Sequence, residues 1–199
     1  MISKKAIISA GIIIFALVCW GYLSDGDKIP DGWFKAGSDP NSYNIGIENK
    51  GGNHGGNTIF IKSNQEKING FGTLMQNFSA EKYLNKRVRF SGYVKSKSVA
   101  GSAGLWMRID GKENPTKPLG FDNMNNRPIK GTSDWKKYNV VLDIPPNSNL
   151  INIGVLLAGT GEIWTSDLKF ETVDKSVPTT DLLSKAKKIE GPVNLDLKK

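Results

Sequence analysis

Residues 87–95 read RVRFSGYVK and residues 103–110 read AGLWMRID, and these two stretches decide the fold. In each of them, apolar side chains alternate with charged side chains or with a tyrosine or tryptophan. Successive side chains of a β-strand point to opposite faces, so each stretch predicts a strand with one face on a core and the other in water. The residues predicted to face the core are Val88, Phe90, Val94, Leu105, Met107 and Ile109.

The same alternation recurs between residues 32 and 173, interrupted by glycine, asparagine and proline. We expect eight strands, at 43–47, 58–63, 71–78, 87–95, 103–110, 138–144, 151–157 and 163–171. The last of these is predicted to bury Trp164, Leu168 and Phe170, and residues 111–136 are predicted to form a long loop. Eight short strands separated by turn residues are typical of an all-β, antiparallel sandwich or barrel.

The first part of the chain is apolar. Residues 6–23 read AIISAGIIIFALVCWGYL and carry no charge, and two lysines precede them. A run of that length is at the lower limit for a helix that crosses a bilayer, and the lysines favour a cytoplasmic N-terminus. We therefore expect a single-pass anchor in the cell membrane, with the C-terminal domain extracytoplasmic. A cleaved signal peptide is the alternative, and lipidation of Cys19 is disfavoured because bulky residues precede it.

These patterns divide the chain into four parts. Residues 1–24 are the anchor or signal peptide, 25–31 a linker, 32–173 the β-sandwich, and 174–199 a tail. In the tail, a short helix is expected near residues 182–189, and the final PVNLDLKK could form one more strand.

Several longer motifs point to a family. They are DGWFKAGSDPNSYNIGIE (31–48), GFGTLMQNFSAEKY (70–83), RVRFSGYVKS (87–96), AGLWMRIDG (103–111), FDNMNNRPIKGTSDWKKYNVVLDIP (121–145) and GTGEIWTSDLKFE (159–171). Together they resemble a galactose-binding-like jelly-roll domain, of the broad group that includes carbohydrate-binding modules. A similar domain is appended to some AraC-type bacterial transcription regulators. The resemblance implies a jelly roll of about eight strands and a non-catalytic role.

The outward side of the two deciding strands carries the best candidates for ligand binding. Trp106 and Arg108 lie opposite the apolar set of one stretch, and Tyr93 and Arg89 opposite that of the other. An aromatic face stacks on a sugar ring, and a guanidinium offers donors to hydroxyl or carboxylate groups. If the two strands pair, the four residues form one patch. The alternative is that Trp106 is covered by the 111–136 loop. Asn123 is a further candidate, because an amide both donates and accepts hydrogen bonds.

No cofactor is expected. His54 is the only histidine, and no second nitrogen or sulfur ligand is spaced for a metal site. The resemblance implies one structural calcium ion between early loops and the final strand, with Glu48 and Asp167 in the matching places. No oxygen-rich loop motif accompanies them, so calcium stays a minor alternative.

Catalysis and nucleic-acid binding find little support in the sequence. No nucleophile elbow is present, and the acids at 110, 122 and 162 do not by themselves make a glycosidase pair. The formal charge is +8, yet the lysines are scattered and no recognition helix is visible. We therefore predict a membrane-tethered, non-enzymatic module that binds carbohydrate or another cell-envelope ligand. The alternative is a structural or protein-interaction domain with no small-molecule ligand.

Overall fold

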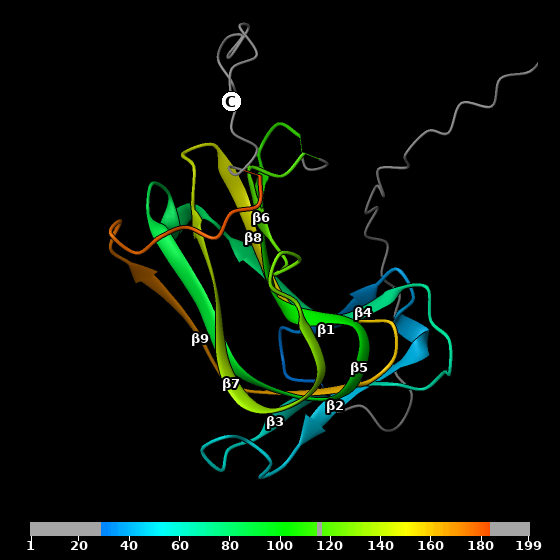
Figure 1. Cartoon of the computed structure of the whole chain (residues 1–199). Helices are drawn as coiled ribbons and strands as arrows, with labels where there is room; N and C mark the ends of the chain where they lie inside the picture. Colours follow the sequence, from blue (N-terminus) through cyan, green and yellow to red (C-terminus); the bar gives the residue numbers. More distant parts are fainter. Residues whose placement is uncertain (1–28, 115–116, 184–199) are drawn as a thin grey trace, which may run out of the picture.

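Antiparallel strands form nearly all of the regular structure in the computed structural model, which describes residues 29–114 and 117–183 (Figure 1). The strands are β1 (Phe34–Gly37), β2 (Tyr43–Glu48), β3 (Thr58–Ser63), β4 (Phe71–Ser79), β5 (Arg87–Gly111), β6 (Gly120–Asp122), β7 (Ile129–Asp143), β8 (Ser148–Ala158) and β9 (Glu162–Val173). Two 3₁₀ turns, η1 (Pro40–Ser42) and η2 (Glu81–Tyr83), join them. The all-β, antiparallel prediction is confirmed.

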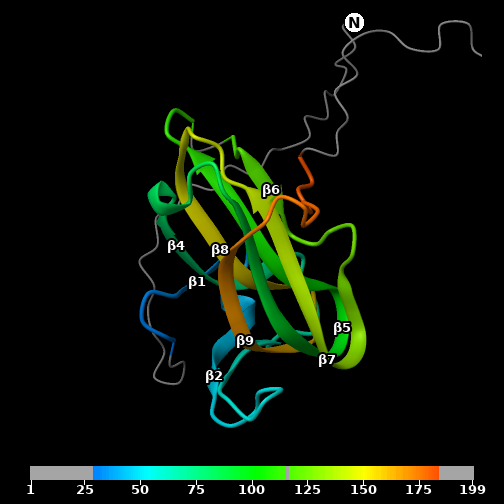
Figure 2. The same ribbon diagram turned by 90° about the vertical axis from the view of Figure 1, so that its left-hand side faces the viewer.

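One strand organises the whole sheet. The sheet order is β1-β4-β8-β5-β9-β3-β2, and β6 and β7 also pair with β5. The first half of β5 pairs with β7 and β9, and its second half pairs with β8 and β6. The 25-residue β5 therefore belongs to both walls of the sandwich, which curve around the core in a nearly barrel-like way (Figures 1 and 2).

The two deciding stretches were predicted as separate strands, and this was wrong because β5 continues through both. Residues 96–102 lack apolar alternation, but they still pair with β7 through register shifts near Ser96 and Val99. Bulges of this kind bend a strand without ending it.

The apolar sides of the predicted strands form the core. Val88, Val94, Leu105, Met107 and Ile109 are completely buried, and Phe90 is 1% exposed. They pack with side chains of β2, β3, β4 and β8 in one cluster. The alternation of the sequence thus placed both halves of β5 correctly.

Strand β9 departs from the prediction at Trp164. Ile163 and Thr165 face inward, so Trp164 faces outward and is half-buried. Leu168 and Phe170 do pack against the core, as expected. Asp167 has φ 52°, and the pairing of β9 with β5 shifts register at this place. One extra residue in a strand reverses the side chains that follow it, which explains why Trp164 and Leu168 lie on opposite faces.

The predicted loop at 111–136 contains regular structure. Strand β6 lies within it, and β7 begins at Ile129 rather than at Tyr138. Strand β1 was also not predicted. The early part of β7 has no alternation to detect, because most of its side chains are exposed on both faces.

The tail begins by following the sheet. Thr180 N–H donates to Val141 O of β7, and Leu182 N–H donates to Phe121 O of β6. Several predicted elements lie outside the described residues. They are the apolar helix at 1–24, most of the linker, and nearly all of the helix and terminal strand expected after residue 182. Among the described residues, no helix is long and apolar enough to cross a membrane.

Candidate functional site

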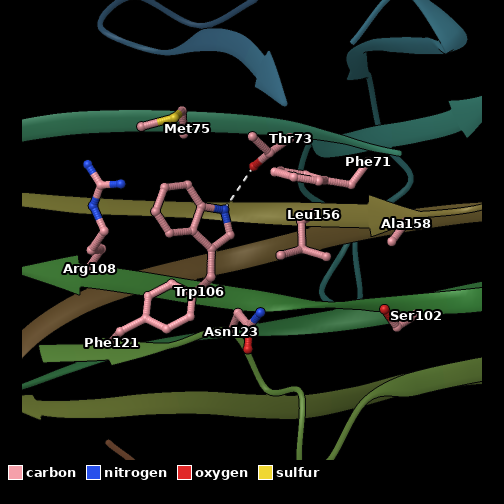
Figure 3. A pocket seen from close by; sticks show the side chains of 10 residues that line it. All are labelled: Phe71, Thr73, Met75, Ser102, Trp106, Arg108, Phe121, Asn123, Leu156 and Ala158. Carbon is pink, nitrogen blue, oxygen red and sulfur yellow. Dashed lines mark hydrogen bonds between the residues drawn. The ribbon is translucent and has the colours of Figure 1, made fainter. Parts of the chain in front are cut away.

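A pocket of about 280 Å³ opens on the outward face of β4, β8 and the second half of β5 (Figure 3). Strand β4 contributes Phe71, Thr73 and Met75 to its lining, and β5 contributes Ser102, Trp106 and Arg108. Leu156 and Ala158 come from β8, and Phe121 and Asn123 come from β6 and the residue after it. We call this site the Trp106 pocket.

Trp106 lies across the middle strand of this face. Its partner on β8 is Gly154, and a Cβ at that position would lie 2.6 Å from Trp106 Nε1. The glycine therefore leaves room for the indole to cross β8 and reach β4. There Trp106 Nε1–H donates to Thr73 Oγ1 over 2.8 Å (Figure 3). The Thr73 hydroxyl in turn donates to Val155 O over 2.7 Å. These bonds fix the ring before any ligand arrives.

Trp106 was expected either to face a ligand or to be covered by the 111–136 loop. In the structure it is largely covered, yet part of it still lines the pocket. The residue is 9% exposed and packs in a small cluster with Ala36 and Met75, separate from the main core. Side chains of β1, β4 and β8 cover much of the ring, rather than a long loop. The uncovered part lines the pocket, so Trp106 is both a packing residue and a wall of the site.

Arg108 is held at the same face by an acidic partner. Its Nη2–H donates to Asp110 Oδ2 over 2.9 Å, and its Nε lies 2.8 Å from Asp110 Oδ1 without the alignment of a hydrogen bond. Asn152 Nδ2–H also donates to Asp110 Oδ2, over 2.8 Å. The guanidinium charge is therefore balanced next to the pocket. Arg108 presents to the pocket an oriented guanidinium whose charge is balanced by Asp110.

Asn123 is placed by a small buried network. Asp122 is fully buried and accepts hydrogen bonds from Arg127 Nη1 and Nη2 at 3.1 and 2.6 Å and from Met124 N–H at 2.7 Å. The Asn123 side-chain oxygen accepts from Asn125 N–H over 3.1 Å. The loop after β6 is thus tied to the sheet, and it keeps Asn123 at the rim of the pocket.

Tyr93 and Arg89 lie elsewhere. Both belong to the first half of β5, where Arg89 pairs with Glu171 at 2.6 Å. The ring of Tyr93 meets His54 edge-on at 5.3 Å, and Lys137 lies over it. The structure therefore brings Trp106, Arg108 and Asn123 together and leaves Tyr93 and Arg89 outside the pocket lining. The two stretches do not pair with each other, because they are one strand.

The two acids considered for calcium are already engaged. Glu48 accepts hydrogen bonds from Lys62 Nζ at 2.7 Å and Trp164 Nε1 at 2.9 Å. Asp167 contacts His54 Nδ1 and accepts from the Ser166 hydroxyl, both at 3.0 Å. Within residues 29–114 and 117–183, no three His, Cys, Asp or Glu side chains are grouped as a metal site requires. The calcium ion stays a prediction.

The carboxylates considered for glycan cleavage each pair with a cation. Asp110 contacts Arg108, Asp122 contacts Arg127, and Glu162 contacts Lys97 at 3.0 Å. These pairs serve the fold and the loop geometry.

Sequence reasoning missed Phe121, Phe71 and Thr73. Phe121 lay inside a predicted loop, although it pairs with Arg108 on β5. Thr73 lies in a correctly predicted strand, but only the position of Gly154 explains why Trp106 reaches it. A glycine in an apolar strand is a signal for close approach, and it could have pointed to this face.

No protein-family model matches the chain. Over 170 residues, the chain is 42% identical to an uncharacterized HTH-type transcriptional regulator of Bacillus subtilis (strain 168), YbfP. The match covers 85% of this chain and 57% of that regulator, so the chain spans little more than half of its length.

Two solved structures show the fold. The CBM22-1 xylan-binding domain of Paenibacillus barcinonensis Xyn10C has a TM-score of 0.50 and 14% identity, covering 74% of this chain and 90% of that domain. The fold is the jelly roll of carbohydrate-binding modules. The enzymatically active domain of bacteriophage CBA120 tailspike protein 4 has a TM-score of 0.55 and 9% identity, covering 76% of this chain and 21% of that one. The resemblance predicted from the sequence motifs is confirmed for the fold.

Proposed function

We propose that this chain is a non-catalytic module that binds neutral carbohydrate in the Trp106 pocket. The observation that carries the proposal is the fixed indole of Trp106, whose Nε1–H is bonded to Thr73 and whose uncovered part lines a concave site. Aromatic walls with a few oriented polar groups at the rim suit the apolar face and the hydroxyls of a sugar. The fold similarity to a xylan-binding domain supports this assignment.

The charge of the site favours a neutral sugar. Asp110 balances Arg108, and Asn123 is uncharged. A sugar carboxylate placed here would meet a guanidinium whose partner is already a buried aspartate, 5% exposed. Hydroxyl groups gain hydrogen bonds at such a rim without adding charge. Neutral oligosaccharides, beginning with those of xylan, are therefore the first ligands to test.

The test uses the full chain and substitutions at the rim. Replacing Trp106 with alanine would remove a packed ring and cost about 3–5 kcal/mol of stability, so its loss of binding would be ambiguous. Phe121→Ala and Asn123→Ala keep the backbone bonds of β6. We expect each to weaken binding of a neutral oligosaccharide at least about tenfold by calorimetry. Tyr93→Ala, which removes an aromatic ring outside the lining of the pocket, is the control. Unchanged affinity in both rim variants would refute the site.

We further propose that residues 6–23 tether the module to the cell membrane with the domain outside the cytoplasm. The support is the uncharged length of that stretch and the lysines before it. Membrane fractionation followed by N-terminal sequencing tests the tether. Recovery of the intact N-terminus in the membrane fraction supports an anchor. A new N-terminus after the apolar stretch would indicate a signal peptide instead.

A protein-interaction domain without a small ligand is the second candidate. The relative that is named a transcriptional regulator favours it, since this chain matches only part of that protein. In such a setting the jelly roll would contact a partner rather than a glycan. Titration of the full chain with neutral oligosaccharides separates the two functions. An interaction domain would show no saturable change in tryptophan fluorescence with any of these sugars.

A further inference from the structure

A second concave site lies beyond the Trp106 pocket and shares no lining residue with it. It has a volume of about 590 Å³ and lies where the first half of β5 meets β9 and β7. Its two aromatic residues are Trp164 and Trp135, and Lys95 is part of the same lining. We call this site the tryptophan groove.

The strand pairing explains why these side chains share one face. Trp164 of β9 pairs with Lys95 of β5, and Val94 beside it faces the core. On the other side of β5, Val94 pairs with Lys136, so Trp135 falls on the outward side next to Lys95. A lysine on the central strand is thus flanked by a tryptophan on each neighbouring strand. Phe60 of β3 pairs with Trp164 and extends the aromatic row.

Trp164 is oriented in advance. Its Nε1–H donates to Glu48 Oε2 over 2.9 Å, and Lys62 Nζ lies 5.2 Å from the ring centroid. Lys62 also pairs with Glu48 at 2.7 Å. Glu48 therefore holds the indole at its edge, and Lys62 lies over the ring. A ring that is fixed in the free protein loses little entropy when a ligand stacks on it.

The charges of the groove differ from those of the Trp106 pocket. Lys62 is paired with Glu48, and Lys97 is paired with Glu162 at 3.0 Å. The contact of Lys95 with Asp134 is longer, at 4.0 Å, and the Asp134 side chain is 85% exposed. A solvated pair of that length is weak. Lys95 is thus the cation of the groove that an incoming anion can engage with the least competition.

We propose that the tryptophan groove binds a carboxylate-bearing polysaccharide, with Lys95 contacting a uronate carboxylate and the two tryptophans contacting sugar rings. Ring faces stack on aromatic side chains, and the hydroxyl of the half-buried Ser133 in the lining can bond to a sugar hydroxyl. One carboxylate per sugar suits one weakly paired lysine.

The test compares oligogalacturonates with uncharged galactan oligosaccharides by calorimetry, on the full chain carrying Phe121→Ala so that neutral sugar bound in the Trp106 pocket does not contribute. We expect the acidic ligand to bind at least tenfold more tightly than the neutral one. Lys95→Gln and Trp135→Ala should each weaken it at least fivefold, and Lys95→Arg should restore most of the affinity. Lys136→Gln is the matched control, since it removes the same charge from an exposed position next to Trp135 that does not line the groove.

The outcomes are separable from those of the first site. Phe121→Ala should leave oligogalacturonate binding unchanged, so failure of the neutral-sugar proposal would not by itself affect this one. If Trp135→Ala does not fold, the lysine variants carry the test. Equal affinity for both ligands, an equal effect of Lys136→Gln, or tighter binding of oligothymidylate that Lys95→Gln also abolishes would overturn the proposal.

Discussion

Gly154 determines where the side chain of Trp106 can lie. The absence of a Cβ lets the indole cross β8, and the space is filled, since Trp106 Nε1 would be 2.6 Å and Leu74 O 2.8 Å from an added carbon. Gly154→Ala should therefore destabilise the fold by about 1–3 kcal/mol through overpacking and change the tryptophan emission spectrum. Gly56→Ala is the control, because nothing lies within 4 Å of its Cβ position. Equal unfolding midpoints would show that the indole does not need the glycine.

Tyr43 is a buried polar residue whose titration can be measured. Its hydroxyl donates to Gly70 O and Gly159 O at 3.1 and 2.9 Å. Burial, followed by the charge of Asp39, raises its pKa from 10.0 to about 12. The unfolded chain releases this proton first, so the stabilisation is present below about pH 10 and about 2–3 kcal/mol is lost as pH rises toward 12.

Tyr43→Phe tests this sign. At neutral pH the variant should be about 1–3 kcal/mol less stable, because two partly buried carbonyls lose a donor. Its stability should then fall less steeply than that of the wild type through the alkaline range, as measured by denaturant unfolding. Parallel curves for the two proteins would mean that Tyr43 titrates normally in the fold.

At the scale of elements, alternation predicted strands well wherever one face is buried. It placed Leu105 and Phe90 in the core, and it located β2, β3, β4 and β8 to within a few residues. It failed where pairing rather than burial creates the strand, as in the bulged middle of β5 and the exposed start of β7. It also failed at Trp164, because the positive φ of Asp167 cannot be read from a period of two.

Ion pairs join the first half of β5 to both of its neighbours. Arg87 pairs with Asp143 of β7 at 2.8 Å, and Arg89 pairs with Glu171 of β9. Hydrogen bonds from Lys169 and then Arg89 lower the pKa of Glu171 from 4.5 to about 2, and Arg87 lowers that of Asp143. Both carboxylates therefore stabilise the fold above their ordinary pKa, and this contribution is lost as pH falls through the lowered values.

Glu171→Gln should flatten the acid limb of the stability curve. Below about pH 4.5 the wild type loses the Glu171 contribution as the group protonates, whereas the variant has no such group. Denaturant unfolding across that range measures the difference. Glu81→Gln, on the exposed turn η2, is a matched control of equal charge. An acid limb as steep in Glu171→Gln as in the wild type would contradict the assigned pKa.

At the scale of the whole molecule, the sequence was sufficient for the fold class but for only part of the site. Trp106, Arg108 and Asn123 do share a pocket. For Trp106 and Arg108 this could be predicted, because an outward position on a strand follows from its inward neighbours, whereas Asn123 lies just after β6 and was proposed only for its amide group. The grouping with Tyr93 and Arg89 failed because it depends on which strands are adjacent. Adjacency in a jelly roll is set by long-range pairing, which a single sequence does not display.

The continuous strand β5 lines both proposed sites, which raises the question of whether binding at one site changes the affinity of the other. A strand could transmit binding from one site to the other only if it had two discrete arrangements. Here the segment between the sites is tied by pairs from Ser96 to Ser133 and from Ala103 to Ile129, and the pockets share no residue. We therefore expect saturation with a neutral oligosaccharide to change the affinity for oligogalacturonate by less than about fivefold, the lower end of typical allosteric coupling.

The double variant Phe121→Ala, Lys95→Gln should likewise lose affinity for each ligand by the same factor as the corresponding single variant. Calorimetric titration of one ligand in the presence of the other measures the coupling, and a larger shift would mean that β5 bends on binding and carries the signal between its two halves.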